Sequence, residues 1–309
     1  MLTLSRLDRR EGAALVRQVV GNDALANGVV EAIVERTDGV PLFVEELSKA
    51  LVESDAPLGA ASGAQWSIAI PTTLQASLMA RLDRLPQGKH VARIGAVIGR
   101  VFPHALLAEV CNVPEAQLGQ GLRELVAAGL MNVHGVPPEA TYTFKHVLVR
   151  DTAYESLLRR TRQQLHAKIA DALETHFPEL LDSQPEIFAQ HYTEAGLVEK
   201  SVAFWAKAGD RSIARSAMGE AAAQFQKGLD QLAALPDRPE RQRQELEFCS
   251  ALGAALMAVK GFAAPETGHV YARARGLWEQ LGFPSEFLDR KSTRLNSSHS
   301  GESRMPSSA

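Results

Sequence analysis

The stretch that decides the fold is Glu115–His146, EAQLGQGLRELVAAGLMNVHGVPPEATYTFKH. Its first half carries leucines at the three- and four-residue spacing of an amphipathic helix, and Gly129 stands where that helix must end. Its second half alternates apolar and polar residues on both sides of a Val-Pro-Pro-Glu turn, which predicts two short strands. We therefore expect a helix that runs directly into a β-hairpin.

Further helices are expected around this stretch. HVARIGAVIG (90–99) and HALLAEVC (104–111) have helical apolar spacing, and an earlier helix over TTLQASLMARLDRL (72–85) is expected to break at Pro86–Gly88. The order helix, helix, helix, hairpin is that of a winged-helix domain. We assign residues 71–176 to this domain together with one long amphipathic helix predicted over 147–176.

Residues 1–54 are expected to form a small helical subdomain. Apolar spacing predicts helices over 10–20 and 24–36, the second capped by Asp23. In the following TDGVPLFVEELSKALVES, Gly39 suits a helix C-terminus and Pro41 suits the first turn of a helix that ends near residue 54. Residues 55–70 are rich in Ala, Gly, Ser and Pro, which is typical of a linker.

Residues 185–288 are expected to form paired helices. Small residues such as Ala208 and Ala221 alternate with large apolar ones such as Trp205 and Phe225, which is how tetratricopeptide-type helical hairpins stack. The strict 34-residue consensus is not visible, so a plain helical bundle stays open as an alternative. The fold class predicted for the chain is mainly α, with a short β-hairpin in the winged helix.

The composition sets broad limits on function. The chain has 309 residues and a net charge of −3, which gives no bulk electrostatic reason to bind nucleic acid or an anionic membrane. The two cysteines stand in separate segments, which does not indicate a disulfide framework. Neither a signal peptide nor an apolar run of bilayer length is visible, so we expect a cytoplasmic protein without a membrane partner.

The last residues, 289–309, have an unusual composition. DRKSTRLNSSH (289–299) and SRMPSSA (303–309) are similar to one-frame translations of two parts of an adapter oligonucleotide used in short-read DNA sequencing. We therefore expect residues 289–309 to be a non-native, disordered tail and the chain to be a fragment of a longer protein.

No catalytic motif is visible in the sequence. There is no G-x-x-x-x-G-K-[ST] phosphate loop, and the nine histidines lack the spacing of a metal site. No Cys/His or Ser/His pair has a recognisable setting. We therefore expect neither a catalytic centre nor a metal site within this chain.

Two stretches nevertheless suggest a nucleotide switch. They are GVPL (39–42) and YTFKHVLVRDTAY (142–154), and the motif GFAAPE (261–266) follows them. Together with the winged helix and the helical repeats, they resemble the STAND class of signalling NTPases, which are multidomain relatives of AAA ATPases. The most similar group is the bacterial one in which an adenylate/guanylate cyclase or kinase domain precedes the ATPase. The resemblance covers about residues 1–288.

The resemblance implies roles for four residues. Gly39 and Pro41 match the Gly-x-Pro motif of the helical lid, in which the proline lies against the nucleotide base. His146 matches the histidine that touches the β-phosphate of ADP, and Arg150 or the neighbouring Lys145 could add positive charge. Here Lys145 and a valine replace the methionine and aspartate of the Met-His-Asp motif. From the residues alone, Pro41 could simply start a helix and His146 could cap a strand at the surface.

Two functions follow as hypotheses. The first is a fragment of an ATP/ADP-switched signalling regulator, whose missing part would carry the phosphate loop, Mg²⁺ and an upstream cyclase or kinase domain. The isolated fragment should need no cofactor. Its partners would be an intramolecular nucleotide domain and a protein or small molecule on the repeats. The second is a non-enzymatic winged-helix transcriptional regulator with a tetratricopeptide-like sensor domain. Nucleic acid is the less expected partner, because the third helix carries Glu115 and Glu124 against one Arg123.

Overall fold

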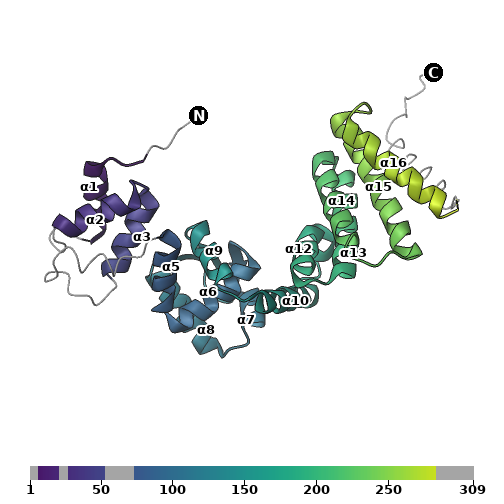
Figure 1. Ribbon diagram of the computed structural model, residues 1–309. Coiled ribbons are helices and arrows are strands. Elements are labelled where there is room, and N and C mark those ends of the chain that lie inside the picture. The colour runs from purple at the N-terminus through teal and green to yellow at the C-terminus, as the bar shows by residue number, and fades with distance from the viewer. Residues whose placement is uncertain (1–5, 21–26, 53–72, 283–309) are drawn as a thin grey trace, which may run out of the picture. The chain divides into compact units, whose positions relative to one another are not determined.

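The computed structural model describes residues 6–20, 27–52 and 73–282 (Figure 1). The chain divides into two compact units, Met1–Ala172 and Leu173–Ala309. The described part is mainly helical, as the sequence predicts. The expected cap at Asp23, the linker at 55–70 and the tail at 289–309 lie outside the described residues.

The first unit begins with a three-helix subdomain made of α1 (Arg9–Val20), α2 (Asn27–Thr37) and α3 (Pro41–Val52). A reciprocal capping box starts α1: the amide of Glu11 donates to the Asp8 carboxylate at 2.8 Å, and the amide of Asp8 donates to Glu11 at 3.0 Å. Apolar side chains from all three helices form one core, namely Val16, Val29, Val30, Ile33, Val34, Val44 and Leu47.

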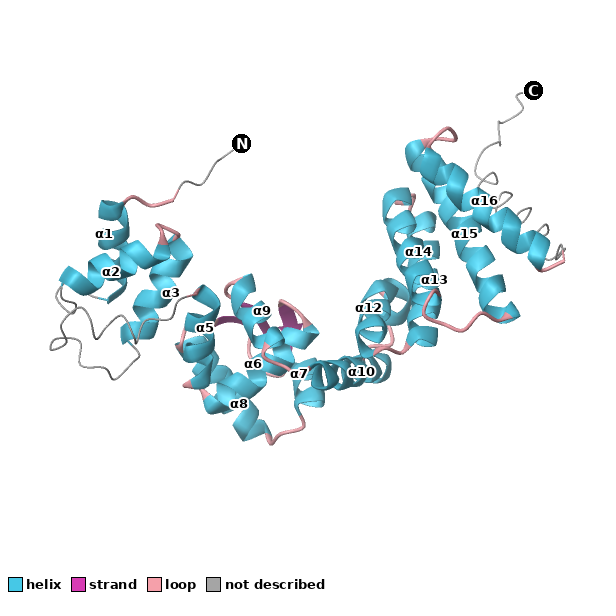
Figure 2. Cartoon of the chain, in the orientation of Figure 1, coloured by secondary structure: helices cyan, strands magenta, loops and turns pink. Residues whose placement is uncertain are grey.

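The rest of the first unit contains a small antiparallel sheet, coloured magenta in Figure 2. Its strand order is β1-β3-β2. Val101 pairs with Thr143, and Met131 pairs with Phe144. The predicted hairpin is therefore confirmed, and Gly129 ends the preceding helix with a left-handed φ of 65°. The elements are α5 (Leu74–Asp83), α6 (Pro86–Ile98), β1 (Val101–Pro103), α7 (His104–Cys111), α8 (Glu115–Ala127), β2 (Met131–His134) and β3 (Thr141–Phe144).

Two predictions near α6 are wrong in detail. Pro86 does not break a helix but opens α6 at its first position, where a missing N–H costs nothing. The helix expected over 90–99 therefore begins four residues earlier, and the real break is at Arg84 and Leu85. Strand β1 was not expected, because three residues are too few to show the alternation typical of a strand.

The single helix expected over 147–176 is also wrong. The chain forms α9 (Val147–Glu155) and α10 (Arg159–His176), separated by three residues. At the break, the Ser156 hydroxyl donates to the carbonyl of Ala153 at 2.6 Å and accepts from Arg93 Nε at 2.8 Å. Such local side-chain hydrogen bonds compete with the helical ladder. The apolar periodicity continues across the break, so it could not reveal it.

The second unit is an array of helices in which each packs on the next in sequence (Figure 1). Three glycines each face an aromatic ring of the following helix so closely that a Cβ would lie under 3.0 Å from the ring: Gly209 with Phe225, Gly228 with Phe248, and Gly253 with Tyr271. The helices are α11 (Leu180–Ser183), α12 (Pro185–Ala195), α13 (Val198–Ala214), α14 (Met218–Leu232), α15 (Pro239–Lys260) and α16 (Pro265–Gln280).

The expected helices over 185–280 are thus confirmed, while their assignment to a tetratricopeptide-like repeat stays a prediction. No helix in the described ranges is both long enough and apolar enough to cross a bilayer.

Candidate functional site

Gly39 lies in the turn between α2 and α3, and the backbone there requires a glycine. Its φ is +69°, and its carbonyl accepts a hydrogen bond from the Leu7 amide at 2.8 Å. A Cβ at this position would collide with the Leu7 carbonyl oxygen. Because it has no side chain, Gly39 allows the backbone of Leu7, just before α1, to pack directly against the turn before α3.

Pro41 is the first residue of α3, as the sequence predicts, and it is exposed. The preceding Val40 is 37% exposed. The start of α3 therefore presents a small apolar surface to solvent, and this surface is free to contact a ligand or another domain.

His146 occupies the position just before α9, with an extended backbone (φ −128°, ψ 143°). Its side chain does not cap the helix, and its Nε2 atom is buried without a hydrogen-bond partner among the described residues. The ring is half-buried, which differs from a histidine that caps a strand at the surface. A buried nitrogen without a partner costs free energy, so it is suited to meeting a ligand atom.

Arg150 lies one turn further along α9 and is half-buried. Its Nε donates to the carboxylate of Asp151 at 2.9 Å, and its Nη2 donates to the same oxygen. Asp151 therefore holds the guanidinium in place, although part of it stays accessible to an anion.

The segments around Pro41 and His146 contact each other through the nearby residues Glu45 and Lys145. Lys145 Nζ lies 3.2 Å from the Glu45 carboxylate on α3. Glu45 is one turn after Pro41, so the two residues share a face of α3. Glu45 also pairs with Lys49, and the hydrogen bond from Lys49, followed by that from Lys145, lowers the pKa of the Glu45 carboxyl. Glu45 is therefore an anion between two ammonium groups.

A buried ion pair lies beside this contact. Glu46 on α3 and Arg81 on α5 are each about 1% exposed, and Arg81 Nη1 donates to Glu46 Oε2. Arg81 Nη2 also donates to the carbonyl of Ala128, the residue that follows α8, at 2.6 Å. The other oxygen, Glu46 Oε1, has no hydrogen-bond partner among the described residues, and Lys49 Nζ lies 3.9 Å from it. One arginine thus joins α3, α5 and the end of α8.

We call this set of contacts the α3 seam: Lys145–Glu45, Arg81–Glu46 and a hydrogen bond from Arg84 Nη1 to the Ala50 carbonyl at 2.9 Å. The seam links the three-helix subdomain to the sheet-containing part of the first unit. One of these contacts, between Glu45 and Lys145, joins α3 to the residue directly before His146.

Sequence reasoning missed Glu46 and Arg81. A signal was nevertheless present, because each is a charged residue within the apolar face of its helix. Glu46 lies four residues before the buried Ala50, and Arg81 lies three residues after the buried Leu78, so each shares a helix face with an apolar residue. Charged side chains are almost never fully buried unless they are paired, so two such residues on neighbouring helices could have been matched.

Within the described ranges, no group of three or more His, Cys, Asp or Glu side chains is placed to hold a metal ion. Lys145 and Arg81 of the α3 seam are paired with carboxylates, and the neighbouring His146 adds an Nε2 atom without a hydrogen-bond partner among the described residues. Nitrogen donors of this kind suit a phosphate better than a metal.

Comparison with protein families gives no match for this chain. The chain is similar to an uncharacterized protein of Rhizobium meliloti (strain 1021), with 28% identity over 264 residues. The match covers 83% of this chain but only 26% of the relative. The chain therefore spans about a quarter of the length of the curated relative that it matches.

Proposed function

We propose that this chain is the switch part of a multidomain signalling regulator that alternates between ADP- and ATP-bound states. Residues 1–54 would form the lid over the nucleotide, the sheet-containing domain would read the bound state, and the helical array would bind a protein or small-molecule signal. The observation that carries the proposal is the α3 seam. The seam joins the segment around Pro41 to the segment around His146. Each segment separately resembles a sequence motif of a nucleotide site.

The local chemistry supports a nucleotide at this place. Pro41 offers an exposed apolar ring without a donor, which suits stacking against a base. The unpartnered Nε2 of His146 can donate a hydrogen bond to a phosphate oxygen. His146 also directly precedes α9, whose first amides favour an anion. These groups would complete a site whose phosphate loop and Mg²⁺ ligands come from a domain outside this chain.

The seam suggests how the nucleotide state would be transmitted. A nucleotide that favours one position of α3 also favours one position of Glu45 and Glu46, which hold Lys145 and Arg81. The equilibrium between two arrangements would then shift by the difference in nucleotide affinity for them. The match covers only 26% of the Rhizobium relative, so that protein is long enough to carry further domains such as the nucleotide, cyclase or kinase domains proposed here.

The first test is to read the gene on both sides of this sequence. An in-frame phosphate loop upstream of residue 1 supports the proposal, whereas a stop codon directly upstream contradicts it. The protein extended by that domain should then bind ADP, and His146→Ala should weaken binding at least tenfold. His134→Ala, which removes an exposed histidine on β2, is the matched control. Equal ADP affinity of the His146 variant would remove the phosphate role.

The alternative, a DNA-binding regulator, stays a prediction. The side chain of Glu124 on α8 accepts the amide of Gly88 at 3.0 Å, and Arg123 donates to Gln120 at 3.0 Å. The helix that would enter a DNA groove therefore has one cation, already engaged within its own surface. Phosphate contacts supply most non-specific DNA affinity, so we expect no gel shift with random duplex DNA even at low salt. A clear shift would favour the alternative.

A further inference from the structure

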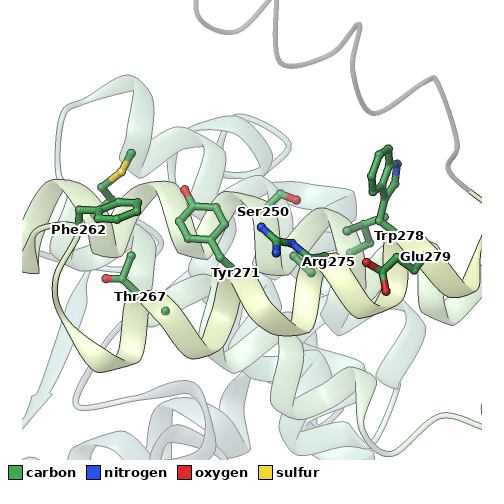
Figure 3. Close-up of a pocket in the computed structure, with 11 residues that line it drawn as sticks. Ser250, Phe262, Thr267, Tyr271, Arg275, Trp278 and Glu279 are labelled. Carbon is green, nitrogen blue, oxygen red and sulfur yellow. The ribbon is translucent and has the colours of Figure 1, made fainter.

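A groove of about 770 Å³ lies between α15 and α16 of the second unit, and aromatic side chains form part of its wall (Figure 3). These rings are engaged inside the unit, because Tyr271 packs on Gly253 and Trp278 packs on the core cluster that contains Leu246 and Leu277. They therefore serve to join α15 to α16. The contacts that are suited to change partner lie in the α3 seam of the first unit.

The two ion pairs of the α3 seam differ in their exposure to water. In the pair of Glu46 with Arg81 each side chain is 1% exposed, whereas Lys145 is 34% and Glu45 28% exposed. Breaking a buried pair costs much free energy, because a charge stays behind without a partner. A partly exposed pair separates at little cost, because water and ions replace either partner. Arg81 therefore anchors α3, whereas the contact between Lys145 and Glu45 is able to open.

Glu45 does not depend on Lys145 for a counter-charge. Its carboxylate also accepts a hydrogen bond from Lys49, and this bond has the largest effect on the lowered pKa of Glu45. Lys49 stands one turn further along the same helix, so its contact with Glu45 persists wherever α3 moves. When Lys145 leaves, Glu45 therefore remains paired.

Lys145 is also the more mobile of the two cations that flank His146 in the sequence. Arg150 is held by two of its nitrogens on the carboxylate of Asp151, its neighbour on α9. Lys145 contacts Glu45 with a single ammonium at the end of a flexible four-carbon stem. It directly precedes His146, whose Nε2 has no hydrogen-bond partner among the described residues. An anion at His146 would thus be close to a cation that can change its partner.

We propose that Lys145 exchanges Glu45 for a phosphate of the bound nucleotide, so that Glu45 is an internal competitor for this ammonium. The inference rests on the proposed function, because it takes the nucleotide phosphates to lie at His146. A phosphate carries more charge than a carboxylate and attracts the ammonium more strongly. Phosphate binding then releases the first half of α3, including Pro41, while Arg81 keeps its hold on Glu46.

The competition works in both directions. Glu45 lowers the affinity for phosphate by the factor that its own contact with Lys145 contributes, and phosphate weakens that contact by the same factor. Lys145 therefore sets both how tightly the phosphate binds and how firmly the start of α3 is held.

The first test measures the affinity of the 309-residue chain for inorganic pyrophosphate, which matches the diphosphate of ADP, by isothermal titration calorimetry. Glu45→Gln should raise the affinity by up to about fivefold, the range for a partly exposed ion pair. Lys145→Met should lower the affinity by about fivefold, and in this background Glu45→Gln should have no further effect. Lys49→Met is the matched control, because it removes an ammonium from the same carboxylate but should not lower the affinity.

The Glu45 carboxyl provides a second measurement, which a purely structural role of Lys145 would not change. Hydrogen bonds from Lys49 and Lys145 lower its pKa. Saturating pyrophosphate should therefore raise the pKa of Glu45, followed by carbon NMR of the side-chain carboxyl, more in the wild type than in Lys145→Met.

The outcomes separate this exchange from the proposed function. Additive effects of Glu45→Gln and Lys145→Met, or no pyrophosphate binding at millimolar concentration, overturn the exchange. The proposed function is tested by ADP binding to the extended protein and its weakening in His146→Ala. ADP binding together with additive effects removes the exchange alone. A non-additive pair of substitutions without ADP binding removes the nucleotide alone and leaves an anion-controlled contact.

Discussion

Gly39 shows how a single residue can combine a structural requirement with a place in the proposed site. Its left-handed φ and its contact with the Leu7 carbonyl leave no room for a side chain. The sequence predicts the helix end at Gly39, because glycine is favoured in this conformation. It cannot predict the contact with Leu7, because that contact depends on the path of the chain before α1.

Gly39→Ala should therefore destabilise the three-helix subdomain by at least about 1 kcal/mol, through both the positive φ and the collision. Urea unfolding followed by circular dichroism would measure the change. Gly28→Ala in α2 is the control, because its Cβ would meet nothing within 4 Å and alanine favours helix. Equal stability of the Gly39 variant would show that the turn tolerates a side chain.

Arg81→Met should be the more damaging change, because it leaves Glu46 buried without its partner. Breaking one side of a buried ion pair costs about 3–5 kcal/mol. The double variant Glu46→Leu with Arg81→Met should recover much of this loss, because no unpaired charge remains. A double-mutant cycle from urea midpoints tests this expectation, and purely additive losses would argue against it.

At the scale of elements, the break between α9 and α10 creates a buried polar contact. Tyr154 Oη and His166 Nε2 lie 3.2 Å apart across the break, and Arg162 stands over the Tyr154 ring. Burial, with a smaller contribution from Arg162, lowers the pKa of His166 from 6.5 to about 4. His166 is therefore neutral in the folded state at pH 7 and stays neutral well below it.

This depressed pKa predicts a loss of stability in acid. Between pH 6.5 and about 4 the unfolded chain binds a proton at His166 that the folded chain does not bind. The free energy of unfolding should therefore fall by up to about 1.4 kcal/mol per pH unit in this window. His166→Gln should lose roughly 2 kcal/mol less than the wild type between pH 7 and 5. The exposed His134→Gln is the control, and matching pH profiles would contradict the assignment.

The elements also show where pattern reasoning succeeds and where it fails. Most helices were predictable because each buries one apolar stripe, as α8 does with Leu118, Leu122 and Leu125. The break after α9 was not, because one of the hydrogen bonds at Ser156 comes from Arg93, more than sixty residues earlier in the chain. In the candidate site, too, only local features could be predicted from the sequence. Gly39 and Pro41 are recognisable as residues of a turn and a helix start, whereas the α3 seam depends on tertiary contacts.

At the scale of the whole molecule, each compact unit contains one buried cysteine, Cys111 in the first and Cys249 in the second. Burial raises the pKa of each thiol to about 11. Both should therefore be almost unreactive towards a thiol reagent at pH 8 while their unit is folded, because the thiolate is the reacting species.

The two thiols should report on their units separately. Arg81→Met is expected to speed the labelling of Cys111, because local unfolding becomes more frequent in the first unit, while the labelling rate of Cys249 should not change. Peptide mass spectrometry after timed labelling distinguishes the two sites. Equal acceleration at both cysteines would show that the units unfold together.

The buried pair of Glu46 and Arg81 has a consequence for how such a sequence can change over generations. Substituting either residue alone is expected to destabilise the protein, whereas substituting both by apolar residues should be tolerated far better. A lineage can leave this arrangement only through an unfavourable intermediate or through two changes at once. Relatives are therefore expected to carry both charges or neither. In an alignment of many relatives, the residues at positions 46 and 81 should change together.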